Sequence, residues 1–343
     1  MIAGAPVSEA ANSVEKLAGR AAVHEAGYYG LPMLKRPLWG WEIAFYFVLE
    51  GISSGSFVLA TMADLFGSGR YSGLIRSARY IAFAGVVPCP PLLIADLGRP
   101  ERFHHMLRIV KPTSPMSAGA WALLLYSQPV ALTALAQFAS LRWIPMRALG
   151  MAGLPFALFL VAYPGVLLST TSIPVWAHTR FLGPLLGASS MASAASAVAI
   201  ATAFDPNSDE ETQIAVRNIE FAAHVCETLA LAAYACTAGP AARPLTTGRY
   251  ARMFWYGAFA AGMIVPALAS VMRKKHSRAT TVISGMLGLA GSLALKWAVV
   301  HAGKDSAEDP SANRHVTRGD SANAGWRPSA QVRTGPGYAP RIG

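Results

Sequence analysis

Long apolar segments that recur along the chain limit its fold more than any other feature. A helix of about 20 apolar residues spans the ~30 Å hydrocarbon core of a bilayer. One such segment could be a buried helix of a soluble protein, but a series of eight could not. The sequence therefore predicts a polytopic membrane protein with spans near residues 38–66, 79–97, 116–141, 148–170, 181–203, 214–238, 250–272 and 279–302.

Composition and pattern favour helices for these spans. Charged residues make up 14% of the chain, against about 25% in soluble proteins. A chain in lipid must pair its own backbone groups, which leaves helices or a closed barrel. Barrel strands alternate polar and apolar residues, and segments such as Ile43–Leu49 and Leu154–Ala162 do not. The fold class is therefore predicted as all-α.

Three regions follow from this pattern. Residues 1–37 are polar and lack the apolar core of a cleavable signal peptide. Residues 38–303 form the predicted eight-helix membrane domain. Residues 304–343 are basic, rich in small residues and Pro, and predicted to be disordered. An acidic loop at 205–211 suggests a division into two helical halves, and we expect two four-helix bundles.

Charge and cysteine content argue against nucleic-acid binding and against a metal cluster within this chain. The net charge is +11, but the basic residues are spread over the loops. This distribution fits contacts with membrane lipid and argues against nucleic-acid binding. The three cysteines, Cys89, Cys226 and Cys236, form no C-x-x-C pair, and an iron–sulfur cluster needs four ligands. We expect no iron–sulfur cluster and no metal in this chain.

Span one carries a polar stripe. An ionisable side chain within a membrane costs ~2.5–3.5 kcal/mol on insertion scales. Glu42, Tyr46 and Glu50 follow the spacing i, i+4, i+8, which places them on one helix face. Glu50 lies deeper than Glu42. The stripe indicates a proton or ligand path, with hydrogen bonding to neighbouring helices as the alternative.

Spans six and eight also contain ionisable residues. Glu220, His224 and Glu227 share one face of span six. The spacing is Glu-x-x-x-His, without a second copy, whereas di-iron bundles use paired Glu-x-x-His motifs. A proton relay or a set of interhelical hydrogen bonds is therefore favoured over a metal site. Lys296 is predicted near the end of span eight, where its side chain can extend to the interface.

Span two is predicted to kink and to end in a charged turn. Prolines remove helix donors and bend the helix, and they stand here at positions 88, 90 and 91. Asp96 and Arg99 follow at the end of the span, close enough in sequence to pair. The pair is interpreted either as part of a functional site or as a clip that holds the fold.

Several of these segments occur in the order typical of one family. The sequence resembles the polysulfide-reductase/NrfD family of membrane subunits over about residues 38–303. The resemblance rests on Trp39-Gly-Trp41, Tyr46–Gly55, Asp96-Leu-Gly-Arg-Pro100, Ser114–Trp121, Tyr163–Ser169, Pro174-Val-Trp176, Trp255-Tyr256 with Val265-Pro266, and Lys296-Trp297.

The resemblance implies an eight-helix subunit that binds a quinone, either menaquinone or ubiquinone, without haem. It implies a ferredoxin-like iron–sulfur partner and often a molybdopterin catalytic subunit. The quinone site of relatives lies at the helix ends facing the partner. Tyr46 matches a position where some relatives have a quinone-contacting His, and Tyr163 matches a Tyr on the fourth span. Asp96 and Arg99 belong to the shared loop, and Glu50 replaces a residue that is commonly small or apolar.

We therefore expect a quinone-interacting anchor of a respiratory complex in the cell inner membrane. Tyr46 and Tyr163 are expected to bind the quinone carbonyls, Asp96 or Glu50 to exchange protons, and Arg99 to set their charge. No residue is predicted to be catalytic by itself. The alternatives are a structural anchor without a quinone site and, less favoured, a secondary transporter.

Overall fold

The described part of the chain is mostly helical. The structure is a computed structural model that describes residues 34–308 except 68, 142, 207 and 273–276, and no strand occurs among these residues. Eight of their helical segments are long and apolar enough to cross a membrane. The prediction of an all-α polytopic membrane protein is confirmed. The spans are Trp41–Phe66, Ser72–Asp96, Pro115–Phe138, Met146–Ser169, Leu182–Phe204, Glu210–Ala238, Met253–Val271 and Arg278–Glu308.

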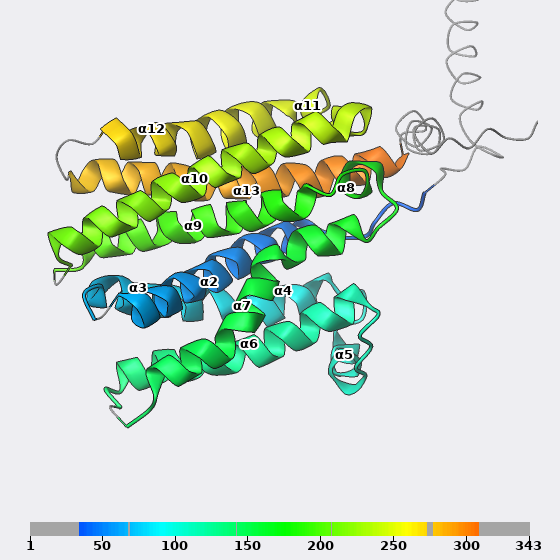
Figure 1. Cartoon of the computed structure of the whole chain (residues 1–343). Coiled ribbons are helices and arrows are strands. Elements are labelled where there is room, and N and C mark those ends of the chain that lie inside the picture. The colour runs from blue at the N-terminus through cyan, green and yellow to red at the C-terminus, as the bar shows by residue number, and fades with distance from the viewer. Residues whose placement is uncertain (1–33, 68, 142, 207, 273–276, 309–343) are drawn as a thin grey trace, which may run out of the picture.

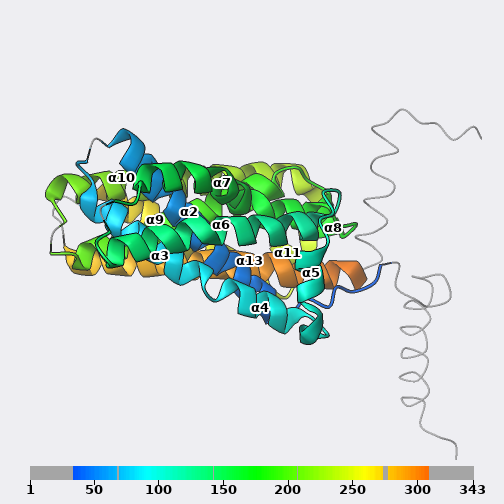
Figure 2. The same cartoon turned by 90° about the horizontal axis from the view of Figure 1, so that it is seen from below.

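The helices divide into two halves (Figure 1). The first half contains α2 (Trp41–Phe66), α3 (Ser72–Val86), α4 (Cys89–Asp96), α6 (Pro115–Phe138) and α7 (Met146–Ser169). The second contains α9 (Leu182–Phe204), α10 (Glu210–Ala238), the π-helix η4 (Met253–Ile264), α12 (Val265–Met272) and α13 (Arg278–Glu308). The short helices α5 (His104–Arg108), α8 (Pro174–Ala177) and α11 (Arg243–Thr246) lie at the end of the bundle where α2 begins (Figures 1 and 2).

Small residues bring the two halves together. A Cβ atom placed on Gly55 of α2 would lie 2.6 Å from Cβ of Ala194 and 3.0 Å from the carbonyl oxygen of Ser190 on α9. Only a glycine lets the two backbones approach this closely, as small residues do in membrane helix pairs. α2 is therefore packed in the centre of the molecule, with both halves around it.

Span two is longer than its apolar pattern predicts. It begins at Ser72, seven residues before the expected Arg79, and contains two arginines near that end. Arg76 is 2.5 Å from the carboxylate of Asp205, and Arg79 is 2.6 Å from that of Asp64. These ion pairs allow a helix to begin with charged residues. The predicted kink is confirmed, because the helix is interrupted between Val86 and Cys89, at Pro88.

The acidic loop at 205–211 does not separate the two halves, and that prediction is wrong. The loop joins α9 to α10 within the second half, and the halves divide between α7 and α9 (Figure 1). Its acidic residues instead bind the basic start of span two. Besides the Asp205–Arg76 pair, Glu211 lies 3.7 Å from Arg70. The negative charge thus attaches the loop to the other half of the protein.

Span eight also extends beyond its apolar pattern, to Glu308. Its last turns fix the residues that precede span one. The Lys304 ammonium donates a hydrogen bond to the carbonyl of Trp39, and Arg36 lies 3.2 Å from Glu308 and 3.8 Å from Asp305. Most of the predicted polar segment 1–37 and of the predicted tail 304–343 lies outside the described residues.

Eight spans place the described chain ends and the loop at 97–114 on the same side of the membrane. Topology reporters fused after Gly98 and after Gly343 should therefore report one side, and a reporter fused after Phe204 should report the other. Enzymatic reporters active only on one side of the membrane make the measurement. Opposite results for the Gly98 and Gly343 fusions would contradict the eight-span arrangement.

Candidate functional site

A cavity of about 290 Å³ lies where α2 begins and α4 ends. This volume is close to the lower end of the ~300–1,000 Å³ typical of ligand pockets. Side chains from α2, α4, α5, α6 and α7 form its wall, so the first half of the protein builds it alone. Its apolar wall includes Ile43, Leu93, Leu97, Met106, Met116 and Leu167.

Two phenol groups face this apolar cavity. Tyr46 on α2 is 2% exposed and Tyr163 on α7 is 4% exposed, and both line the cavity. Neither hydroxyl forms a hydrogen bond within the described part of the chain. A buried tyrosine hydroxyl normally has a partner. The two hydroxyls are thus available to a ligand, and the structure brings both of these predicted residues to the wall of one cavity.

Gly119 on α6 gives Tyr163 its place in the cavity wall. A Cβ atom on Gly119 would lie 2.1 Å from Cζ of Tyr163 and 2.2 Å from its hydroxyl oxygen. No side chain fits there, so the tyrosine ring crosses α6 at this point. The sequence analysis assigned no role to Gly119. The run of small residues Ser117-Ala-Gly-Ala120 was the available signal, but it does not reveal which partner occupies the space.

Asp96 lines the same cavity and also connects two helices. Its Oδ1 atom accepts a hydrogen bond from the backbone N–H of Gly40 at 2.9 Å. The bond joins the end of α4 to the start of α2. Because one carboxylate oxygen makes this bond, the other can contact a ligand. Both interpretations of Asp96, site residue and structural clip, are compatible with this geometry.

Arg99 does not pair with Asp96, and that prediction is wrong. Both residues are described, and no ion pair joins them; Arg99 is exposed and does not line the cavity. The cause is the backbone after α4. Leu97 adopts an extended conformation, with φ −71° and ψ 124°, and the backbone then enters a short 3₁₀ turn at Pro100. This path carries the guanidinium away from the helix end.

Glu50 lies one helical turn deeper than Tyr46 and does not line the cavity. It is 1% exposed, and neither carboxylate oxygen has a hydrogen-bond partner among the described residues. Its electrostatic partner is Lys296 of α13. Glu42 belongs to the same stripe, lies in the first turn of α2 and is partly exposed.

Lys296 is fully buried, so the prediction that it reaches the interface is wrong. Its ammonium donates a hydrogen bond to Oγ of Ser190 at 3.3 Å and interacts electrostatically with Glu50 and Glu227. The reason is the length of α13, which ends twelve residues later at Glu308. At 1.5 Å per residue, Lys296 is about 18 Å from that end.

The polar face predicted on span six is confirmed as an interhelical hydrogen-bond set. Glu220, His224 and Glu227 are all buried. His224 Nδ1 lies 3.3 Å from Glu227, and His224 Nε2 lies 3.3 Å from Oγ of Ser196 on α9. The Ser196 hydroxyl donates to Glu220 at 3.4 Å. These contacts join α10 to α9.

Comparisons with known proteins agree on one family. The family described as Polysulphide reductase, NrfD matches residues 31–306. One relative is a polypeptide of the polysulfide reductase of Wolinella succinogenes. The two sequences are 27% identical over 299 residues, which cover 78% of this chain and 94% of that protein. Protein NrfD of Escherichia coli is also 27% identical, over 302 residues that cover 78% of this chain and 95% of that protein.

A shorter similarity, 35% identity over 88 residues, links the chain to a subunit of the selenate reductase of Mesobacillus selenatarsenatis. It covers 26% of this chain and 20% of that protein. The family match covers most of the eight-span region that contains the cavity. The chain therefore belongs to the polysulphide reductase NrfD family.

Proposed function

We propose that this protein is the quinone-binding membrane subunit of a respiratory reductase complex in the cell inner membrane. The observation that carries the proposal is the cavity, in which two tyrosine hydroxyls without partners among the described residues face an otherwise apolar wall. A quinone head group is a flat apolar ring with two carbonyl oxygens. The apolar wall suits the ring, and the Tyr46 and Tyr163 hydroxyls are the donors that its oxygens need.

A second hollow supports this assignment by providing a place for the tail. A groove of about 150 Å³ shares Leu93, Leu97, Met106 and Ala120 with the first cavity and continues along α4 and α6. The part of its wall that the first cavity does not share is largely apolar and includes Phe103 and Leu107. A ligand with a polar head and a long isoprenoid tail suits two such adjoining spaces.

The residues around the cavity can hold the ring and handle its protons. When bound, a quinone supplies two-electron chemistry in which each carbonyl oxygen gains a proton on reduction. Tyr46 and Tyr163 would orient the oxygens. Asp96 is the carboxylate in the cavity wall and would exchange protons there, while its bond to Gly40 keeps it in position. Glu50 is the next carboxylate inward.

Electrons require a partner, because the sequence predicts no redox centre in this protein. We propose a ferredoxin-like iron–sulfur subunit, joined to a molybdopterin-type catalytic subunit, at the end of the bundle where the cavity lies. Two relatives are each one component of a reductase, as expected for members of assemblies with several subunits. Exposed basic residues at this end include Arg99, before α5, and Arg108, the last residue of α5.

The position of the cavity favours this function over transport. Transporters usually place their site near the bilayer midplane, between two repeats with broken helices in corresponding positions. Here the cavity lies at the helix ends and within the first half alone. A structural anchor without a quinone site remains the competing function, and the variants of Tyr46 and Asp96 below distinguish it from the proposal.

Tyr46→Phe should weaken quinone binding without loss of stability. Removing one neutral hydrogen bond costs ~0.5–1.5 kcal/mol, which corresponds to an affinity loss of roughly two-fold to tenfold. Because the hydroxyl has no partner among the described residues, the melting temperature of the complex should not change. Titration of a quinone-site inhibitor against the purified complex measures the affinity.

Tyr126→Phe is the matched control. The Tyr126 hydroxyl is fully buried and lies 2.9 Å from Oγ of Ser53, away from the cavity. This variant should lower the melting temperature and leave inhibitor affinity unchanged. If Tyr46→Phe behaved in the same way as Tyr126→Phe, Tyr46 would be a packing residue and the proposal would lose its main support.

Asp96→Asn and Asp96→Ala separate proton exchange from the structural clip. The amide oxygen of Asn still accepts the hydrogen bond from Gly40, but the amide group does not exchange a proton with the quinone. Quinone-coupled turnover per complex should therefore fall at least about tenfold in Asp96→Asn, while the amount of assembled complex stays near wild type. Asp96→Ala should lower both. Normal turnover in Asp96→Asn, with assembly lost only in Asp96→Ala, would leave Asp96 as a clip alone.

A further inference from the structure

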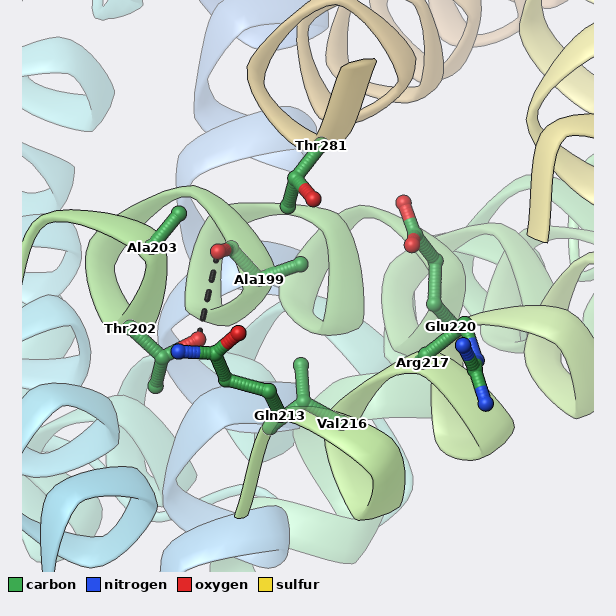
Figure 3. A pocket seen from close by; sticks show the side chains of 8 residues that line it. All are labelled: Ala199, Thr202, Ala203, Gln213, Val216, Arg217, Glu220 and Thr281. Atoms are coloured by element: carbon green, nitrogen blue, oxygen red, sulfur yellow. Dashed lines mark hydrogen bonds between the residues drawn. The ribbon is translucent and has the colours of Figure 1, made fainter. Parts of the chain in front are cut away.

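Two hollows outside the quinone cavity differ in size and in the chemistry of their walls. One lies at the opposite end of the bundle and has a volume of about 30 Å³, enough for roughly two water molecules. Figure 3 shows polar side chains such as Gln213, Glu220 and Thr281 in its wall. The other is a groove of about 360 Å³ with apolar and aromatic side chains in its wall. The groove, unlike the small hollow, has room for a large apolar ligand.

The groove lies over α13, which contacts both α2 and η4. Four residues of α13 and one each of α2 and η4 line it: Ala290, Leu293, Ala294, Trp297, Phe45 and Met253. It begins near the end of the bundle where α2 starts, because Phe45 is in the second turn of α2 and Met253 is the first residue of η4. From Trp297 to Ala290 it follows α13 for about 10 Å. The groove therefore runs inward along the membrane-spanning part of the protein.

The backbone of η4 and the small residues beside it keep this groove open. η4 is a π-helix over Met253–Ile264, a form that is rare beyond a single turn and frequent at functional sites. Glycines bring it close to α13: a Cβ atom on Gly262 would collide with Cα of Gly291, and one on Gly257 would lie 3.2 Å from Cβ of Ala294. The two helices thus meet through small residues, which provide no side chain to cover the groove.

Aromatic side chains gather at the outer end of the groove. The Trp297 ring stacks on that of His301, with 4.5 Å between centroids, and the His301 ring lies 5.7 Å from that of Tyr250. Trp41 is 53% exposed and its ring packs edge-on against Phe45. Trp and Tyr side chains concentrate at the membrane–water interface. The groove therefore opens at the level of the lipid head groups and continues into the region of the acyl chains.

Two arginines beside this opening have no ion-pair partner among the described residues. The Arg249 guanidinium carbon lies 5.7 Å from the centroid of the Tyr250 ring, and Arg252 directly precedes Met253 of the groove wall. Both arginines are exposed. The segment 239–272 contains three arginines and no Asp or Glu. Basic residues next to an apolar space between membrane helices attract anionic lipid head groups.

We propose that the groove binds one molecule of an anionic phospholipid, with its phosphate at Arg249 and Arg252 and one acyl chain along α13. Guanidinium groups form strong charge-assisted hydrogen bonds with phosphate. An acyl chain is surrounded by hydrocarbon whether it is bound or free, so the groove adds packing and little hydrophobic driving force. The arginines therefore select the lipid, and the groove fixes the position of its chain between α2 and η4. This site is independent of the quinone function.

Native mass spectrometry of the purified full-length protein measures a dissociation constant for each lipid that binds. The first dioleoylphosphatidylglycerol should bind at least about tenfold more tightly than the first dioleoylphosphatidylcholine, since each arginine contributes roughly fivefold. The double variant Arg249→Gln, Arg252→Gln should lose this preference and keep its affinity for phosphatidylcholine. Arg217→Gln, in the wall of the small hollow (Figure 3), is the charge control and should retain the preference. Equal affinities of the wild type for both lipids would overturn the proposal.

Ala290→Phe tests the position of the acyl chain. Ala290 is exposed in the groove wall, so a phenyl group there fills the groove without disturbing the helix contacts. Affinity for phosphatidylglycerol should fall about fivefold or more, because the chain loses its packing contacts. Ala152→Phe, at an exposed position of α7, is the matched control and should bind as wild type does. Unchanged affinity in Ala290→Phe would show that the chain lies elsewhere and that the groove is not the site.

A measurement on the wild type alone covers the case in which a variant fails to fold. Phosphatidylglycerol with a diazirine in one acyl chain is photolysed with the full-length protein, and the labelled residues are located by mass spectrometry. We expect labelling of Met253, Leu293 or Trp297, and its loss with excess unlabelled phosphatidylglycerol. Absence of label from these residues would contradict the proposal. Displacement by decylubiquinone and not by phosphatidylglycerol would assign the groove to a quinone instead.

Discussion

The close approach of α2 to α9 is the contact on which the rest of the structure depends. It is possible because Gly51 and Gly55 present no side chain to α9, so the two backbones and the Ser190 side chain fill the space. In this packing Glu50 is buried and Tyr46 lies at the cavity wall. A larger residue at Gly51 would collide with the Lys296 ammonium and with the side chain of Ser190, and it would push α2 away from α9.

The two ends of the bundle have different chemistry. At one end, α2, α4, α6 and α7 surround an apolar cavity with two phenols and one carboxylate. At the other, ion pairs between the basic start of span two and the acidic loop before α10 fix the helices. Buried charges are costly unless they are paired, and Arg70, Arg76 and Arg79 at this end each have a carboxylate partner.

The apolar pattern was sufficient to predict the helices, because each span must satisfy its own backbone within lipid. The family resemblance placed Tyr46, Tyr163 and Asp96 at one site. Both failed where contacts between distant residues decide the outcome. The arginines of span two are tolerated because Asp64 and Asp205 bind them, and Lys296 is central because α13 continues to Glu308. The bond from Gly40 to Asp96 and the space that Gly119 leaves for Tyr163 depend on three-dimensional packing that spacing in the sequence does not encode.

The central claim is that the cavity between α2 and α7 holds the quinone ring. A quinone with a photoreactive group on its ring, illuminated in the purified complex and located by peptide mass spectrometry, tests this claim most directly. We expect labelling of residues in the cavity wall, Met106, Met116 and the segment around Tyr163, and loss of labelling when a quinone-site inhibitor competes. Labelling confined to the groove on the opposite side of α2, at Phe45 and Trp297, would contradict the assignment.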